Sequence, residues 1–233
     1  MSGPGCYFIG KEEEALVIEA IRSRQLNRYH FDSEDGQNNS MVARFESDFR
    51  RVTASPYCLA LNSCTSALIC ALHAHSIGIG DEVLVPGYTF AATAAAPCLL
   101  GATPVFVEID DTLGISLEDL ERKCSPKTRA VIAVHMLGRP CDMKAILEFC
   151  LRKNLVLIED VAQACGASFE GKFLGTFGSA GCFSFNIFKV LTAGDGGALL
   201  CSDSDIYEKS FAFHDHGFFP SHARVIDGTE IVG

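Results

Sequence analysis

Residues 156–189 read VLIEDVAQACGASFEGKFLGTFGSAGCFSFNIFK, two short apolar segments separated by a glycine-rich one. Val156 to Glu159 and Gly181 to Phe185 have the length and composition of buried strands. The residues between them are rich in glycine and suggest hairpin-like pieces. A polar residue follows each strand, Asp160 after the first and Lys189 beyond the second. We therefore expect a buried sheet with reactive side chains where its strands end.

The rest of the chain alternates between strand-length apolar segments and helix-length segments. This alternation implies right-handed crossovers and a largely parallel sheet in an α/β fold. Further strands are expected at Tyr57–Leu61, Glu82–Val85, Pro104–Ile109, Ala130–His135 and Gly197–Cys201, and helices at Lys11–Arg24, Val42–Arg51, Thr65–His75, Ala91–Leu100, Leu117–Lys123 and Asp142–Lys153.

The composition describes a globular protein with an acidic balance. The 233 residues are 48% hydrophobic and 21% charged, enough for one well-buried domain or two small ones. The net charge of −10 argues against nucleic acid or an anionic membrane as the main partner. Residues 1–10 lack the pattern of a signal peptide, and no apolar run is long enough to span a bilayer. We expect a soluble protein.

The eleven cysteines do not suggest a disulfide framework, because their number is odd and their spacing irregular. Most lie in apolar stretches, where a thiol acts as a small buried hydrophobic group. The sequence contains no CxxC pair, so we expect no structural zinc site and no metal. Reduced thiols in the cytoplasm are the simplest interpretation.

Three polar clusters fall where strands end, and each allows two interpretations. The cluster from Asn62 to Ser66 suits a bound phosphate at a helix N-terminus, or an ordinary helix cap. Asp160, followed by Gln163, suits a cationic ring nitrogen, or caps the next helix. Lys189, with Ser184 before it, is a desolvated amine nucleophile or a solvated loop lysine. No cluster is decisive alone.

Taken together and in order, the clusters resemble the DegT/StrS family of fold-type I pyridoxal-phosphate (PLP) aminotransferases. The resemblance runs from about Gly10 to about Gly217. It implies an aspartate aminotransferase-like large domain with three α/β/α layers. The matching segments are Asn62 to Leu68, Gly78 to Val83, Val85 to Phe90, Gly101 to Val107, Val134 to Gly138, Ile158 to Ala164, Cys182 to Phe185, and Lys189 with Gly194 to Gly197.

The resemblance assigns roles to matching positions. Lys189 matches the lysine that forms the internal aldimine with PLP. Asp160 matches the carboxylate paired with the pyridinium nitrogen, which keeps the ring an electron sink. Gln163 matches a residue near the ring and its phenolic oxygen. Phe90 matches an aromatic residue stacked on the ring, although a core phenylalanine is the commoner case.

The phosphate cradle and one histidine complete this set of implied roles. Thr65, Ser66 and Ser184 match the residues that hold the cofactor phosphate. His135 ends a strand in a motif of the family, and either a structural or a functional role suits it. The polar segment Asn27 to Ser40 contains Arg28, Tyr29 and His30 and reads as a surface loop or as a substrate contact.

The implied reaction moves an amino group from glutamate or glutamine to a keto sugar, with a nucleotide-linked hexose as first choice. A keto-cyclitol such as an inosose is the second. Some family members have histidine at the lysine position and carry out dehydration, and others have been linked to regulation. Lys189 argues against the dehydratase, and the intact set of residues argues against a non-catalytic regulatory relative.

The resemblance also predicts the domain organisation. Residues 1–55 are expected to form a helical segment with a substrate loop, and residues 56–217 a PLP-binding large domain. Residues 218–233 would be a loop leading to a C-terminal small domain that this chain lacks. Fold-type I sites are built at a dimer interface, so a homodimer is expected.

Overall fold

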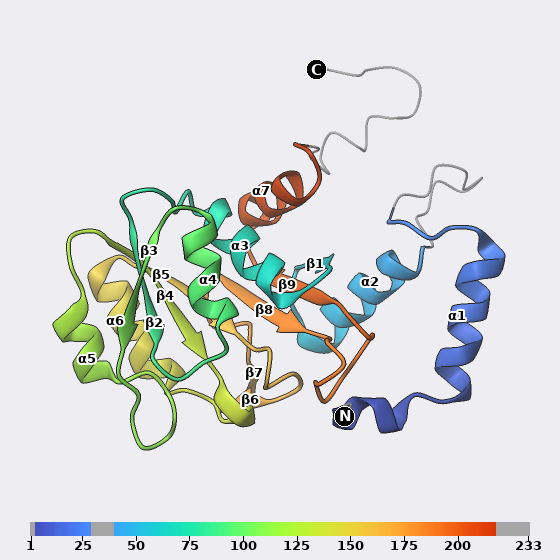
Figure 1. The fold of residues 1–233 in the computed structure, drawn as a ribbon, viewed down its shortest axis with the longest axis horizontal. Helices are drawn as coiled ribbons and strands as arrows, with labels where there is room; N and C mark the ends of the chain where they lie inside the picture. The colour runs from blue at the N-terminus through green and yellow to red at the C-terminus, as the bar shows by residue number, and fades with distance from the viewer. Residues whose placement is uncertain (1–2, 29–39, 218–233) are drawn as a thin grey trace.

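The computed structural model describes residues 3–28 and 40–217, and its centre is a seven-stranded sheet (Figure 1). The strands run in the order β1-β9-β8-β5-β4-β2-β3. Their bounds are β1 Tyr57–Leu61, β2 Glu82–Pro86, β3 Thr103–Val107, β4 Thr128–Val134, β5 Val156–Asp160, β8 Ala180–Ser184 and β9 Gly197–Cys201.

Every pairing in this sheet is parallel except the two made by β9, which runs antiparallel to both β1 and β8. The expected largely parallel sheet is confirmed, and the two antiparallel pairings make it mixed. Because the parallel strands share one direction, β2, β4, β5 and β8 all end at the same edge. That edge gathers side chains far apart in sequence.

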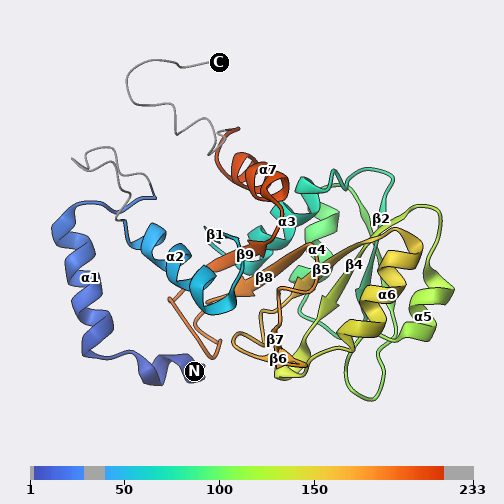
Figure 2. The ribbon, with the colours of Figure 1, turned by 180° about the vertical axis from the view of Figure 1, so that it is seen from behind.

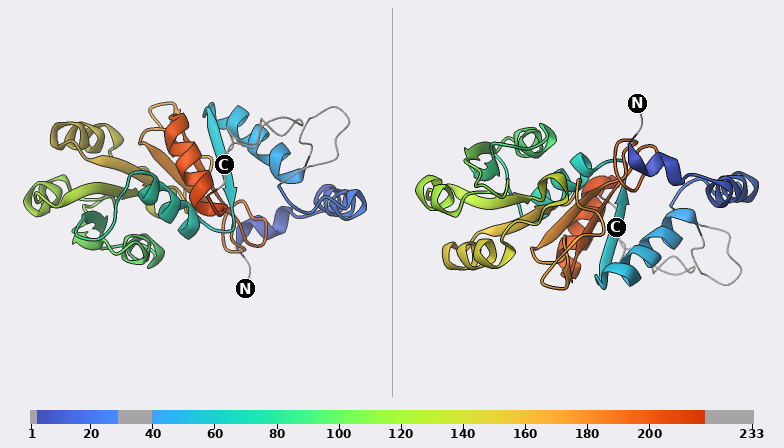
Figure 3. Two further views of the ribbon diagram at one scale, coloured as in Figure 1. Left: turned by 90° about the horizontal axis from the view of Figure 1, so that it is seen from above. Right: turned by 90° about the horizontal axis from the view of Figure 1, so that it is seen from below.

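Helices cover both faces of the sheet and complete the expected three layers (Figures 2 and 3). The bulky strand residues alternate between two apolar clusters, with Val83 and Val85 on one face and Leu84 on the other. The first face carries α3 Cys64–Ala74, α4 Ala92–Leu99 and α7 Ser204–His214, and the second carries α2 Met41–Thr53, α5 Leu117–Lys123 and α6 Met143–Lys153.

The N-terminal part of the chain is less closely packed. The 3-10 helix η1, Pro4–Phe8, precedes α1, Lys11–Ser23, which has no buried residue and stands apart from the sheet in Figure 3. By contrast, α2 places Phe45 and Phe49 against the core. No helix among the described residues is long and apolar enough to cross a bilayer.

The predicted strands and helices all occur, with ends that differ by at most a few residues. The hairpin-like stretch contains β6, Ser168–Phe169, antiparallel to β7, Lys172–Phe173. A second short 3-10 helix, η2 Met136–Gly138, follows β4. Helix α7 was not predicted from the sequence. The expected loop at residues 218–233 lies outside the described residues.

Candidate active site

A cavity of about 420 Å³ opens at the sheet edge where β4, β5 and β8 end. The structure brings six of the predicted site residues into its lining, although they come from distant parts of the sequence. They are Thr65, Phe90, Asp160, Gln163, Ser184 and Lys189. Of the predicted cofactor-binding residues, Ser66 alone is absent from this lining.

Asp160, the last residue of β5, places a buried carboxylate in the cavity wall, and its side chain is 5% exposed. Oδ1 accepts the backbone N–H of Ala162 at 3.1 Å, and Oδ2 accepts the hydroxyl of Thr93 at 2.8 Å. The described residues offer no cationic partner within salt-bridge distance. A buried carboxylate held only by neutral donors is suited to a cationic group on a ligand.

Two donors to Asp160 were not predicted. Thr93 is fully buried in the first turn of α4 and also exchanges a hydrogen bond with Thr89 at 2.7 Å. The Cys64 thiol lies 3.7 Å from Asp160 Oδ1 as a hydrogen-bond donor. Burial and then the Asp160 charge raise the pKa of this thiol well above its usual value, so the thiol keeps its proton. Cys64 lies in a segment of the resemblance and Thr93 lies outside all of them, and nothing local in sequence links either residue to Asp160.

The N-terminus of α3 forms another part of the cavity wall. Ser63 is its N-cap, and the side chain accepts the backbone N–H of Ser66 at 3.1 Å. The backbone N–H groups of Cys64 and Thr65, in the first turn, have no acceptor within the helix. With the hydroxyls of Thr65 and Ser184 beside them, these donors suit a phosphate or another anion.

Ser66 points away from this cavity, into a neighbouring hollow that it shares with Arg28, Asn62 and His214. Its hydroxyl lies 2.6 Å from Asn62 Oδ1 and 3.1 Å from Ser63 Oγ. Ser66 therefore supports the N-cap from outside the cavity, and its predicted contact with a phosphate remains a prediction.

Lys189 lines the cavity from the turn that follows β8, and it is partly buried. Its backbone N–H donates to Asn186 O at 2.9 Å, which fixes the turn. Among the described residues, no hydrogen bond or ion pair engages its ammonium group. A primary amine and a buried carboxylate therefore face one cavity.

Gln163 and Phe90 complete the lining. Gln163 Oε1 accepts the backbone N–H of Leu137 at 3.1 Å, and its side-chain NH₂ makes no hydrogen bond to another described residue. Phe90 is 69% exposed. A core role for Phe90 is therefore wrong, and its ring is free to cover a flat ligand.

His135 lies away from the cavity and is fully buried. Its Nδ1 accepts the backbone N–H of Cys141 at 3.2 Å, so the ring proton lies on Nε2 and donates to Glu159 Oε2, also at 3.2 Å. Both ring nitrogens are thus satisfied, and the structural interpretation of His135 is the one the geometry supports.

The predicted substrate loop is mostly outside the described residues, including Tyr29 and His30. Arg28 is described and is engaged within the protein. It pairs with Glu46, donates to the Ala60 carbonyl at 2.5 Å, and lies over the Phe211 ring. Burial raises the pKa of Glu46 although Arg28 opposes this shift.

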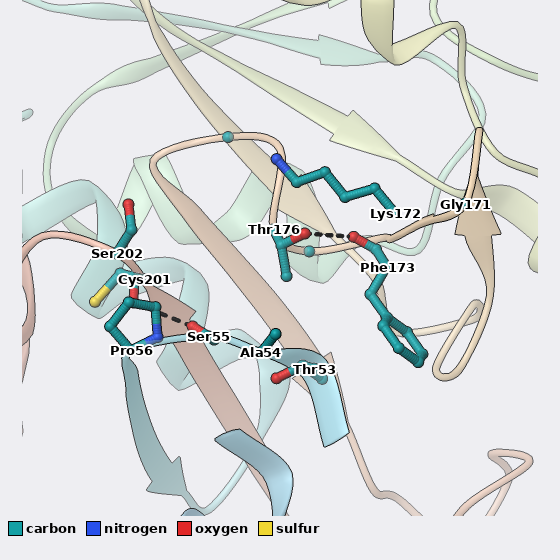
Figure 4. Close-up of a pocket in the computed structure, with 12 residues that line it drawn as sticks. Thr53, Ala54, Ser55, Pro56, Gly171, Lys172, Phe173, Thr176, Cys201 and Ser202 are labelled. Carbon is teal, nitrogen blue, oxygen red and sulfur yellow. Dashed lines mark hydrogen bonds between the residues drawn. The ribbon is translucent and has the colours of Figure 1, made fainter. Parts of the chain in front are cut away.

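A separate hollow of about 380 Å³ lies at the opposite edge of the sheet (Figure 4). Its Ser55 hydroxyl donates to the Cys201 carbonyl at 3.1 Å, and its Thr176 hydroxyl donates to the Phe173 carbonyl at 2.7 Å. The hollow contains no predicted site residue. These two hydroxyls donate to backbone carbonyls of the protein itself. We therefore place the candidate active site in the cavity that contains Asp160.

The sequence pattern of the DegT/DnrJ/EryC1/StrS aminotransferase family matches residues 10–229. The chain belongs to this family. A GDP-perosamine synthase from Escherichia coli O157:H7 is 40% identical over 89% of the chain, and an L-glutamine:2-deoxy-scyllo-inosose aminotransferase from Streptomyces kanamyceticus is 42% identical over 82%. The structure of an aminotransferase from Psychrobacter cryohalolentis matches 97% of the chain with a TM-score of 0.86 and 32% identity.

The match covers only part of the length of these relatives. The chain spans 55% of the E. coli protein, 46% of the S. kanamyceticus protein and 55% of the P. cryohalolentis chain. The similarity confirms the aminotransferase fold that the sequence motifs predict.

Proposed function

We propose that the chain is the cofactor-binding part of a PLP-dependent aminotransferase that transfers an amino group from glutamate or glutamine to a keto sugar. The observation that carries the proposal is one cavity lined by the Lys189 amine, the buried Asp160 carboxylate and the N-terminus of α3. These three groups differ in charge and chemistry, and each matches one group of PLP. The amine matches the aldehyde, the carboxylate matches the protonated pyridine nitrogen, and the helix N-terminus matches the phosphate.

The described residues fit PLP by the chemistry of their donors and acceptors. Asp160 is an anion without a described cation, which suits a protonated pyridine nitrogen. The free N–H groups of α3 and the hydroxyls of Thr65 and Ser184 suit a phosphate. Phe90 is exposed beside the cavity, and a flat ring would cover it.

When bound, PLP supplies an electron sink for the substrate carbon that loses its proton. Lys189 would hold the cofactor, and its amine would move a proton as general base. Asp160 keeps the ring nitrogen protonated by opposite charge. Thr65 and Ser184 fix the phosphate, and Gln163 donates near the ring oxygen.

A keto-cyclitol is the second candidate acceptor. The S. kanamyceticus relative, named for an inosose substrate, is as similar to this chain as the relative named for GDP-perosamine. We prefer the nucleotide-linked keto sugar as the sequence-based first choice. Lys189 argues against a PLP-dependent dehydratase, and the assembled cavity argues against a non-catalytic regulatory protein.

We also propose that the protein acts as a homodimer in the cytoplasm. Phe90 and Phe188 are exposed beside the cavity, and a second subunit would shield such rings. The odd number of cysteines and the burial of most of them suit a reducing compartment.

The test is the Lys189→Ala variant with added PLP. Lys189 Nζ would condense with the cofactor aldehyde and release one water, giving a visible absorbance that alanine cannot produce. We expect the variant to lack this absorbance and to have no measurable transfer from glutamate or glutamine to a panel of keto sugars and inososes. Persistence of the absorbance in the variant would overturn the assignment of Lys189.

A further inference from the structure

The N-terminal segment of the chain lies against the turn that carries Lys189 (Figure 1, where the blue N-terminus meets the orange loop after β8). The backbone N–H of Gly3 donates to the Ile187 carbonyl at 2.9 Å, and that of Gly5 donates to the Lys189 carbonyl at 3.0 Å. The Cys6 thiol donates to the Ile187 carbonyl at 3.5 Å. Three contacts thus join residues more than 180 positions apart in sequence.

The turn has few other restraints. Within the described parts of the chain, every other hydrogen bond to the backbone of residues 187–189 involves Asn186. Asn186 lies in the same turn, and its side chain donates to Asp195 at 2.8 Å. Local contacts shape the turn, while the N-terminal segment is what ties it to a distant part of the chain.

The two glycines are required by the close approach of the two backbones. A Cβ on Gly3 would lie 2.3 Å from the carbonyl carbon and oxygen of Phe188. A Cβ on Gly5 would lie 2.8 Å from the Lys189 carbonyl oxygen and 3.0 Å from that of Val190. Neither glycine has a positive φ, so the backbone conformation itself would accept alanine. Contact with the turn is therefore what excludes a side chain.

We propose that residues 3–6 are a positioning strap that holds the Lys189 turn so that its amine faces the cavity. This proposal rests on the proposed function of Lys189 and deepens it. The strap does not touch the cofactor cavity, because none of residues 3–6 lines it. It acts through the backbone carbonyls on either side of Phe188.

If residues 3–6 position the Lys189 turn, losing them should impair the covalent attachment of PLP to Lys189 without impairing the binding of PLP itself. In the described parts of the chain, Asp160 and the N-terminus of α3 make no hydrogen bond or ion pair with residues 3–6, so they would still bind PLP when the strap is lost. The displaced lysine would then react less with the bound aldehyde. A general loss of folding would instead lower total binding and covalent attachment together.

The experiment compares Gly5→Ala and a variant lacking residues 3–8 with wild type and with Gly10→Ala. The deletion removes the strap without introducing a clash. Gly10→Ala is the matched control, because a Cβ at that position meets only Glu13 Oε2, at 3.8 Å. Total bound PLP is measured after gel filtration, and the covalent fraction by borohydride reduction and mass spectrometry. Hydrogen exchange of residues 187–193 is followed without cofactor.

We expect both strap variants to lose at least half of the covalent fraction at equal total PLP, and their turns to exchange faster without cofactor. Gly10→Ala should match wild type in both measurements. Wild-type covalent fractions and exchange rates in both strap variants would overturn the proposal. If wild type binds no PLP while the strap variants still exchange faster, the strap stands and the proposed cofactor function fails.

Discussion

At the scale of single residues, the environment of Asp160 sets the chemistry of the cavity. Its carboxylate accepts hydrogen bonds from the Thr93 hydroxyl, the Ala162 backbone N–H and the Cys64 thiol. These neutral donors fix the orientation of the carboxylate without neutralising its charge. A charged group held in this way costs little to reorganise when a ligand cation arrives. The sequence predicts Asp160 itself because it ends a strand, but Thr93 and Cys64 lie in other segments and meet it only through the fold.

Replacing Thr93 tests this arrangement. Thr93→Val keeps the shape of the side chain but removes the donor, and a hydrogen bond to a charged group contributes about 1.5–3 kcal/mol. Without the donor, Asp160 is free to rotate from its position in the cavity wall. We expect the Kd for PLP to rise about tenfold, which corresponds to about 1.4 kcal/mol. Titration of apoprotein followed by cofactor fluorescence measures this change.

Thr93→Ser is the matched control, because it restores the hydroxyl at the same position. We expect its Kd to lie close to that of wild type. If Thr93→Val and Thr93→Ser weaken PLP binding equally, the loss of affinity comes from the packing of the threonine methyl group and not from the hydrogen bond to Asp160.

At the scale of elements, the strands of the large sheet and the first six helices were predictable, whereas helix α7 and the contacts that hold the loops were not. β1 and β9 occur with the predicted ends, since apolar segments bounded by polar or glycine residues mark buried strands directly. Helix α7 was missed because it buries only Ile206, Ser210, Phe211 and Ala212, an irregular pattern. Its N-cap, Asp203, which accepts the backbone N–H of Asp205, was the available signal.

The loop from Gly175 to Gly178 shows why connections need long-range information. Glu159 is fully buried on β5 and accepts the backbone N–H groups of Gly175, Phe177 and Gly178 at 2.7–2.8 Å. His135 donates the fourth hydrogen bond. The Glu159 carboxylate thus accepts the backbone hydrogen bonds that a helix or strand would otherwise satisfy in this loop. No local sequence pattern indicates that arrangement.

Replacing Glu159 should therefore destabilise the protein. In Glu159→Gln the side-chain NH₂ would face backbone donors, and at least one buried N–H would lose its acceptor. We expect the free energy of unfolding to fall by about 2–4 kcal/mol. Urea denaturation of apoprotein measures it. Glu148→Gln, at an exposed position of α6, is the control and should leave the stability unchanged. Equal stability of Glu159→Gln and wild type would exclude this role for the carboxylate.

At the scale of the whole molecule, the cavity is assembled from segments that span most of the chain. Thr65, Phe90, Asp160 and Lys189 reach it from separate connections at one sheet edge, and the N-terminal strap holds the last of these connections. The sequence could predict this convergence because parallel strands end together. It could not predict that Ser66 faces a neighbouring hollow, since the direction of a side chain on the first turn of α3 depends on how the helix packs.

Because binding would join so many segments, PLP should stabilise the whole fold. A ligand at one hundred times its Kd adds about 2.7 kcal/mol, which corresponds to a rise in Tm of about 5–10 °C for a chain of this size. Differential scanning calorimetry of the apoprotein with and without PLP measures the rise.

Pyridoxal, which lacks the phosphate, should give a smaller rise in Tm because the N–H donors at the N-terminus of α3 then have no phosphate to bind. Lys189→Ala should fall between these cases, since it keeps the phosphate contacts and Asp160 but loses the covalent bond. Equal rises with pyridoxal and PLP would show that the N-terminus of α3 does not bind the phosphate, and no rise with PLP would contradict a cofactor site in this cavity.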